Sequence, residues 1–242
     1  MDNIIYGKNV VLEALKANHD IDSIYVASLE KNPILNKIIS MAKEKGIIVK
    51  EVDKRKLFEI CNNNNHSGVV ARVALYKYCS VDEIIEKNQD SDRPIKIIIC
   101  DGIEDPHNLG AIIRTCECAG FDGVIIPKRR SVGVTDTVIK IASGAIEYVK
   151  IARVTNLSAT IEYLKSKGIW VYAADMNGQD MYKTNLKGNV AVVIGSEGKG
   201  VSKLVEEHCD GVISIPMYGH INSLNASVSA AVVIYEINRQ NL

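Results

Sequence analysis

Residues 190–200 read VAVVIGSEGKG, and residues 211–227 read GVISIPMYGHINSLNAS. Both segments begin as an apolar run typical of a buried strand and continue into glycines and small polar side chains. In open α/β sheets, ligands bind at the edge where the strands end. We therefore expect an active site between Gly195 and Asn225, formed by the loops that follow these two strands.

The rest of the C-terminal half alternates apolar strand patterns with helical patterns. Near-continuous apolar strands of this kind indicate a parallel sheet covered by helices on both faces. The expected strands cover 95–100, 123–126, 148–154, 169–174, 190–194 and 211–215, and the helices cover 109–119, 135–142 and 157–167. A last helix, at about 225–239, is rich in Ala, Ser and Val and suits close packing, including packing between subunits.

A smaller α/β unit precedes this sheet. Its helical patterns cover 8–17, 33–45 and 53–61, and its strand patterns cover 21–27, 47–52 and 69–75. Polar residues with one short helix at 81–87 follow and end at Pro94, which is typical of a linker. The predicted organisation is an N-terminal domain over 1–76, a linker over 77–93 and a second domain over 94–242.

Composition limits the class of protein. The chain has 242 residues, of which 47% are hydrophobic, so it can form substantial cores. Its longest apolar runs fall far below the roughly 20 residues that a membrane helix needs. The N-terminus lacks the basic start and apolar core of a secretory signal. We expect no membrane partner and a cytoplasmic location.

The charges of the chain are balanced, with two local basic clusters. The 29 basic residues balance the 29 acidic ones, so any contact with a nucleic acid must be local. Lys50 with residues 54–56 is one basic cluster, and residues 128–130, which follow a strand, are another that could contact phosphate. Both clusters could also be simple solvated surface.

The six cysteines form no Cys-x-x-Cys pair, and no group of side chains has metal-ligand spacing. We therefore expect reduced structural thiols and no metal.

Two common nucleotide motifs are absent. A P-loop requires glycine where Val193 stands and Ser or Thr where Gly200 stands. A dinucleotide fingerprint belongs after the first strand of its domain, whereas Gly195, Gly198 and Gly200 come late in this one. These mismatches argue against a P-loop NTPase and against an oxidoreductase.

A further polar motif opens the second domain. Asn108 follows its first strand, and Arg114 comes six residues later on the expected helix, so we place both on roughly one helical flank. Apolar neighbours surround Arg114 in the sequence. A buried ion pair is the structural interpretation of this arginine, and a fixed cation for a phosphate or a leaving oxygen is the functional one.

Together these segments resemble the SpoU/TrmH family of RNA ribose 2'-O-methyltransferases. The family's Asn-x-Gly-x-x-x-Arg motif corresponds to Asn108, Gly110 and Arg114, and its Gly-x-Glu-Gly-x-Gly motif corresponds to residues 195–200. The third motif corresponds to Ile215-Pro216-Met217 through Ser223-Leu224-Asn225-Ala226-Ser227. The N-terminal unit, with Tyr6-Gly7 and residues 66–71, resembles the substrate-binding domain of the RlmB branch, which methylates a guanosine of 23S ribosomal RNA.

The resemblance implies a fold, a cofactor and an assembly. The fold is a trefoil-knotted (SPOUT-type) α/β methyltransferase domain preceded by a small α/β RNA-binding domain. S-adenosylmethionine is the implied methyl donor, and a homodimer with its active site near the interface is the implied assembly. The implied cofactor-binding residues are Gly195, Ile215 and Leu224, and the implied catalytic residues are Asn108, Arg114, Glu197, Ser223 and Asn225. Ala226 replaces the valine of many relatives and leaves the polar groups of the motif in place.

Other functions remain open at this stage. A transfer-RNA ribose methyltransferase or a ribosome-protecting resistance methyltransferase would share the same catalytic domain. Outside the enzyme class, an RNA-binding factor could keep the fold and lose catalysis. Loss of the motif Arg, Glu or Asn would mark such a factor, and this chain retains Arg114, Glu197 and both Asn108 and Asn225.

Overall fold

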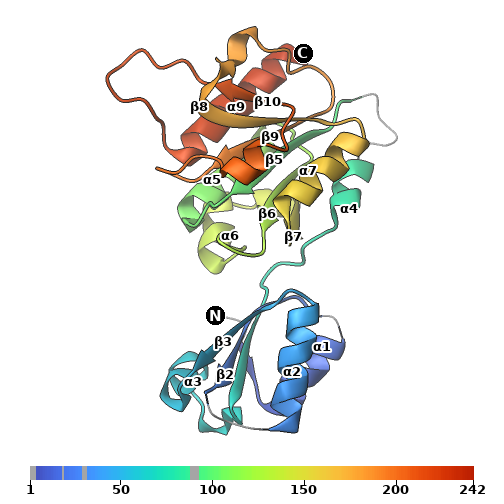
Figure 1. Cartoon of the computed structure of the whole chain (residues 1–242), viewed down its shortest axis with the longest axis vertical. Coiled ribbons are helices and arrows are strands. Elements are labelled where there is room, and N and C mark those ends of the chain that lie inside the picture. The colour runs from blue at the N-terminus through green and yellow to red at the C-terminus, as the bar shows by residue number, and fades with distance from the viewer. Residues whose placement is uncertain (1–3, 18, 29–31, 88–92) are drawn as a thin grey trace. The chain divides into compact units, whose positions relative to one another are not determined.

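The structure is a computed structural model that describes residues 4–17, 19–28, 32–87 and 93–242. The chain divides into two compact units. One comprises Met1–Lys77 with Val134–Asp136, and the other comprises Tyr78–Gly133 with Thr137–Leu242. Each unit has its own sheet (Figure 1) and its own hydrophobic core.

The N-terminal unit contains a four-stranded sheet in the order β1-β4-β2-β3. Strands β2 and β3 are parallel, whereas β4 runs antiparallel to both β1 and β2. The strands are β1 (Ile4–Tyr6), β2 (Ile21–Ala27), β3 (Ile48–Val52) and β4 (Val69–Val73), and the helices are α1 (Lys8–Lys16), α2 (Pro33–Glu44) and α3 (Lys54–Cys61). Strand β1 has only three residues, too few for a sequence pattern to reveal it.

Two separate apolar clusters cover the faces of this sheet. Helices α1 and α2 bury residues spaced three or four apart, such as Leu35, Ile38 and Ala42, against one face. Helix α3 packs on the other face through Leu57. Asp53 caps α3 by accepting a hydrogen bond from the Lys56 amide at 2.7 Å. The loop that follows α3 therefore begins on the face of the sheet opposite α1 and α2.

The second unit contains a six-stranded, fully parallel sheet in the order β10-β8-β9-β5-β6-β7. This arrangement confirms the predicted parallel α/β domain. Its strands are β5 (Lys96–Asp101), β6 (Gly123–Pro127), β7 (Lys150–Val154), β8 (Trp170–Asp180), β9 (Val190–Gly195) and β10 (Gly211–Ser214). Its helices are α4 (Val81–Glu86), α5 (Pro106–Cys118), α6 (Asp136–Ala142), α7 (Leu157–Ser166), α8 (Lys203–Glu206) and α9 (Ala226–Gln240).

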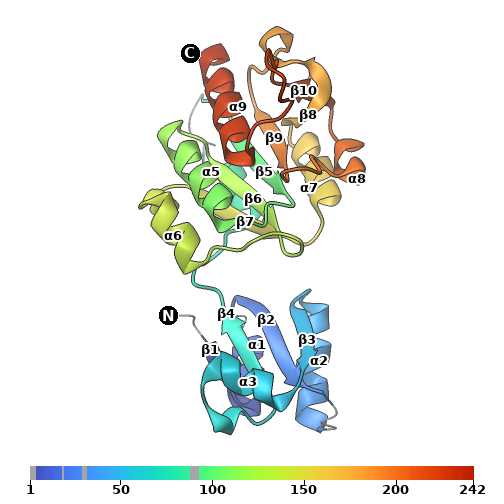
Figure 2. The same ribbon diagram turned by 90° about the vertical axis from the view of Figure 1, so that its left-hand side faces the viewer.

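Helices cover both faces of this sheet, as continuous apolar strands require. Helices α5 and α9 lie side by side on one face, and α7 and α8 lie on the other (Figure 2). Consecutive residues of a central strand point to opposite faces, so Ile97 and Ile99 join the α7 side while Ile98 is buried on the other. Central strands β9 and β5 end at Gly195 and Asp101, which are direct neighbours in the ladder.

Residues 78–87, expected as a linker, pack on the second unit. Ile84 of α4 is fully buried in the core cluster of this sheet, and Cys79 forms a parallel bridge with Ala152 of β7. The Ser80 hydroxyl and the Glu83 carboxylate form a reciprocal capping box at the start of α4. The apolar positions within this polar stretch are therefore core positions.

Strand β8 is longer than its sequence pattern indicated. The expected strand ended at Ala174, but β8 continues to Asp180, and its pairing with β10 shifts in register between Val212 and Ile213. Gly178 allows this close approach, because a Cβ there would lie 2.5 Å from the Ile213 carbonyl carbon. The extension places residues 175–177 at the edge where the neighbouring strands end.

The trefoil knot that the resemblance implies stays a prediction. In the part of the chain that the structure describes, no helix is long and apolar enough to cross a membrane.

Candidate functional site

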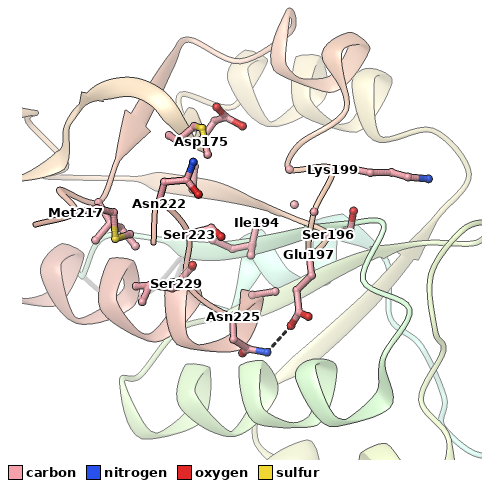
Figure 3. A pocket seen from close by; sticks show the side chains of 18 of the residues that line it. Asp175, Ile194, Ser196, Glu197, Lys199, Met217, Asn222, Ser223, Asn225 and Ser229 are labelled. Atoms are coloured by element: carbon pink, nitrogen blue, oxygen red, sulfur yellow. Dashed lines mark hydrogen bonds between the residues drawn. The ribbon is translucent and has the colours of Figure 1, made fainter. Parts of the chain in front are cut away.

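A cavity of about 690 Å³ opens past the carboxyl ends of β9 and β10, beside residues 174–177 of β8. Three segments that are distant in sequence form its walls (Figure 3). The lining comprises Ala174–Asn177, Ile194–Gly200, Ile215, Met217, Asn222–Ala226 and Ser229. Six of the predicted site residues lie here, namely Gly195, Glu197, Ile215, Ser223, Leu224 and Asn225.

Three polar side chains meet at the edge of this cavity. The Asn108 Nδ2 donates to Glu197 Oε1 at 2.9 Å, and the Asn225 Nδ2 donates to Asn108 Oδ1 at 2.9 Å. A further short hydrogen bond joins Asn225 Nδ2 to Glu197 Oε1 (Figure 3). Each of the three sequence motifs contributes one member of this triad, so the structure brings the motifs together.

The helix caps determine the direction of these amides. Asn225 is the N-cap of α9, and its Oδ1 accepts from the Ser227 and Val228 amides at 2.9 and 3.3 Å. With the oxygen engaged in the cap, the Nδ2 group points toward Glu197. Asn108 lies in the first turn of α5, where Asp105 is the cap and Pro106 opens the helix, and its side chain is buried.

The glycines of the second motif have separate physical roles. A Cβ on Gly195 would lie 2.0 Å from the carbonyl carbon of Gly200, so only glycine fits there. Gly198 and Gly200 have φ angles of +81° and +65°, in the left-handed region that favours glycine. Paired backbone hydrogen bonds of 3.2 and 3.0 Å between Ser196 and Gly200 close this turn. The turn thus presents main chain to the cavity.

Gly110 of the first motif lies outside the cavity. A Cβ there would approach the Cβ of Ile141 to 2.7 Å, so this glycine permits close packing of α5 against α6. Its place in the motif is explained by helix packing and requires no contact with a ligand.

A second cavity, of about 490 Å³, shares the turn at 196–200 with the first. It is bounded by the loop after β5, by Asn108 and by Arg130. Arg130 belongs to the basic cluster at 128–130, has a φ angle of +56° and has an exposed side chain. Glu197 and Lys199 line both cavities. Two adjoining spaces that meet at a carboxylate suit a reaction between two bound molecules.

The placement of Arg114 on the flank of Asn108 was wrong. Six residues turn an α-helix by about 600°, which leaves the two side chains about 120° apart. Asn108 accordingly points inward, whereas Arg114 is exposed and lines neither cavity. The buried ion-pair interpretation is also wrong, because Arg114 is exposed and has no ion pair with the residues that the structure describes.

Residues 175–177 line the cavity but were not predicted. The Asp175 carboxylate accepts from the amide and the side chain of Asn177 at 3.1 Å each, which holds this part of β8 in place. The sequence signal was the apolar run that ends at Ala174, beside β9. Asn222 was missed in the same way, although it lies between two quoted parts of the third motif.

Cysteine chemistry has no place in this site. Burial raises the pKa of Cys100 to about 12 and raises the pKa of Cys116 as well. None of the six cysteines lines either cavity, and all six are unbridged. No group of His, Cys, Asp and Glu among the described residues could hold a metal ion. The site therefore relies on amides, carboxylates and main chain.

The fold and site define a parallel α/β protein with a ligand-sized cavity at the carboxyl edge of its sheet. The family model described as "SpoU rRNA Methylase family" matches residues 96–235, and one described as "RNA 2'-O ribose methyltransferase substrate binding" matches residues 4–79. The chain belongs to the SpoU/TrmH family of RNA methyltransferases.

Whole-chain relatives agree with this assignment. A protein of Staphylococcus aureus (strain COL), named as a TrmH family tRNA/rRNA methyltransferase, is 46% identical over 241 residues, which cover 99% of this chain and 96% of that protein. The protein of Staphylococcus haemolyticus with the same name is 45% identical over 240 residues, with the same coverage. The match extends over both units.

The fold also matches a solved structure. The SpoU methyltransferase AviRb from Streptomyces viridochromogenes, in complex with the cofactor AdoMet, has a TM-score of 0.61 at 20% identity. The alignment covers 98% of this chain and 89% of that one. At this identity the likeness concerns the fold alone.

Proposed function

We propose that this chain transfers a methyl group from S-adenosylmethionine to the ribose 2'-hydroxyl of a guanosine in 23S ribosomal RNA. The observation that carries the proposal is the triad of Asn108, Glu197 and Asn225, which joins all three family motifs at the junction of two cavities. The substrate-binding family model over residues 4–79 supports RNA as the acceptor. We place the reaction in the cytoplasm, with the ribosomal RNA.

The larger cavity fits the methyl donor. Its volume of about 690 Å³ lies within the usual range of roughly 300–1,000 Å³ for small-molecule and cofactor sites. Main chain at Gly195, Ile215 and Leu224 is positioned to pair with the adenosine part, because the turn at Gly195 has no side chain in the way. S-adenosylmethionine, when bound, supplies a methyl group on a positively charged sulfonium. The Glu197 carboxylate supplies a fixed negative charge at the wall of this cavity.

The second cavity is the proposed place of the acceptor ribose. It adjoins the donor cavity at residues 196–200, as a direct transfer between two bound molecules requires. Arg130 and Lys199 provide cations there for a phosphate of the RNA backbone. Ser223 and Asn225 face the donor side of the same junction. In this arrangement the main contribution of the protein is to hold the two reactants in line.

We assign Arg114 to the site of a partner subunit. Its side chain is exposed and lines neither cavity of its own chain. An arginine guanidinium keeps its proton at neutral pH, so its role is to stabilise the developing alkoxide or to hold the neighbouring phosphate. A phosphate oxygen or a water molecule would then accept the proton.

An apolar surface near the cavity supports a homodimer. The loop that lines the donor cavity exposes Tyr218 and Ile221, and helix α9 exposes Val228 and Tyr235, which are seven residues apart and share one helical face. Apolar patches of this kind on a folded protein commonly mark interaction surfaces. Helix α5, which carries Arg114, packs beside α9 (Figure 2).

A transfer RNA is the alternative acceptor, since the relatives' name includes both tRNA and rRNA. Mapping of 2'-O-methyl marks in a strain lacking this gene separates the two. Loss of one mark in 23S ribosomal RNA, restored by the wild-type gene and not by Asn225→Ala, is the expected result. Loss of a mark in a transfer RNA alone, or of no mark, would overturn the ribosomal assignment.

A further inference from the structure

A third hollow, which belongs to neither cavity of the catalytic unit, lies on the N-terminal unit. It has a volume of about 500 Å³ and is formed between helix α3 and the loop before β4. We call it the α3 hollow. Its principal lining residues are Lys54, Arg55, Phe58, Asn64, His66 and Ser67.

The helix side of the α3 hollow combines cations with an aromatic ring. Lys54 and Phe58 are four residues apart and therefore share one face of α3, and Arg55 is the neighbour of Phe58 at a spacing of three. Phe58 is 40% exposed, which is high for a phenylalanine. The Arg55 side chain is 89% exposed, and its ion pair with Glu59, at 3.6 Å, is too exposed to hold it firmly.

The loop side contributes a hydrogen-bond donor on the mostly buried ring of His66. His66 is only 7% exposed, and its Nδ1 accepts from the Gly68 amide at 3.1 Å. In the neutral ring this hydrogen bond leaves the proton on Nε2. No described residue is hydrogen-bonded to Nε2, and His66 lines the hollow. A ring N–H that faces this hollow without a protein acceptor is available to an acceptor from outside the chain.

Internal hydrogen bonds hold this loop in its shape. Asn63 Nδ2 donates to the Tyr6 hydroxyl at 2.9 Å, and Asn63 Oδ1 accepts from the Asn65 amide at 2.8 Å. Ser67 has a φ angle of +49°, so the chain turns sharply directly after His66. A loop that is already ordered loses little conformational entropy when a ligand binds.

We propose that the α3 hollow binds one unpaired nucleotide of the substrate RNA, at a distance from the methylated ribose. The base stacks on Phe58, the adjoining phosphate binds Arg55 and Lys54, and the His66 Nε2–H donates to an acceptor on the base or ribose. Exposed aromatic rings beside cations suit single-stranded RNA, whose bases have free faces, and do not suit a duplex. This proposal depends on the proposed function only in taking RNA as the substrate.

Binding of a fluorescein-labelled, mixed-sequence single-stranded RNA 20-mer to the full-length chain tests the proposal. Phe58→Leu, which keeps an apolar side chain but removes the ring, should weaken binding about tenfold, and Phe58→Trp should restore it. Arg55→Ala should weaken binding and reduce the slope of log affinity against log salt by about one. Annealing the same strand to its complement should remove the effect of Phe58→Leu.

Helix α2 offers matched controls on the same unit. The exposed fraction of Ile34, 37%, is similar to the 40% of Phe58. Lys37 is an exposed cation with no ion pair to a described residue. Ile34→Ala and Lys37→Ala should leave RNA affinity and its salt slope unchanged. S-adenosylhomocysteine affinity, measured by calorimetry, should be unchanged in all five variants, which shows that the catalytic unit is intact.

Two results would overturn the proposal. One is wild-type affinity in both Phe58→Leu and Arg55→Ala, and the other is an equal loss in the α2 controls. Kinetics separate this failure from failure of the proposed function. If the proposed function is wrong, the wild-type chain methylates no 23S ribosomal RNA. If only the α3 hollow is wrong, the wild-type chain methylates RNA and Phe58→Leu has an unchanged KM instead of the expected rise in KM at constant kcat.

Discussion

The side-chain amides of Asn108 and Asn225 are hydrogen-bonded at 2.9 Å, although 117 residues separate them in the sequence. Asn108 lies in the first turn of α5 and Asn225 caps α9, so this bond joins the starts of two helices that pack on the same face of the sheet. Glu197 accepts from both amides. A change in any one of these three side chains should therefore alter the position of the other two.

Asn225→Ser separates the capping role of this residue from its role in the triad. Serine caps helices about as well as asparagine, so the thermal midpoint should stay close to that of the wild type. The variant has no amide to donate to Glu197, and kcat/KM for methyl transfer should fall by about 100-fold, the usual scale for misplacement of reacting groups. Asn225→Ala should lose activity and, in addition, about 1 kcal/mol of stability. Wild-type activity in Asn225→Ser would remove the amide from the mechanism.

Glu197→Gln tests whether the carboxylate acts through its charge. Glutamine Oε1 can accept the same two amide hydrogen bonds, so the shape of the cavity should persist. S-adenosylmethionine carries a positive sulfonium and S-adenosylhomocysteine does not. Calorimetry should show about tenfold weaker binding of the former, equivalent to about 1.4 kcal/mol, and little change for the latter. Glu147→Gln, at an exposed position outside both cavities, is the control. An equal loss for both ligands would assign Glu197 a purely structural role.

Arg114→Ala should abolish transfer while leaving S-adenosylhomocysteine affinity unchanged, because Arg114 lies outside the donor cavity of its own chain. Co-expression with Asn225→Ala tests the partner-subunit role. A heterodimer of the two inactive chains has one site with both Asn225 and the partner subunit's Arg114, so it should recover a substantial part of the activity of one wild-type site. Absence of recovery in a purified heterodimer would place Arg114 in its own chain's site.

Stability should decline in acid through Glu236. This buried carboxylate of α9 accepts from Arg239 Nε and Nη2 at 2.8 Å each, and the hydrogen bonds from Arg239 hold the pKa of Glu236 below its ordinary value. A depressed folded-state pKa contributes stability that is present above the unfolded pKa of about 4.3 and is lost as pH falls through the folded value.

Thermal unfolding of Glu236→Gln measures this contribution. At pH 7 the variant should melt about 3 °C below the wild type, corresponding to about 1 kcal/mol for a chain of this size. The difference should shrink as the pH falls below about 4. Glu117→Gln, exposed on α5, should show neither effect. A difference that stays constant down to pH 3 would contradict the assignment.

Much of the fold could be predicted because its determinants are local. Continuous apolar strands between helical patterns required a parallel sheet, and the polar loops after β9 and β10 marked the edge that holds the site. The second half of β8 was missed because Asp175 and Asn177 have low strand propensity, and pairing with β10 determines their conformation.

The arrangement of the site depended on tertiary contacts that no sequence pattern contains. The spacing of six residues suggested that Arg114 lies beside Asn108, but the turn of the helix directs the two side chains about 120° apart. Motif matching grouped Gly110 with the site, although its small size serves the contact with Ile141. Arg130 could be recognised only as one of three adjacent cations until the structure placed it at the second cavity.

Nucleoside analysis after methyl transfer tests the central claim most directly. Purified protein is incubated with S-adenosylmethionine bearing a deuterated methyl group and with 23S ribosomal RNA transcribed in vitro, and the digested nucleosides are separated by mass spectrometry. We predict that the wild-type protein forms deuterated 2'-O-methylguanosine. Asn225→Ser should form it at no more than about 1% of the wild-type rate, which is the usual loss when reacting groups are misplaced. Label on a base, or equal label with both proteins, would contradict the account.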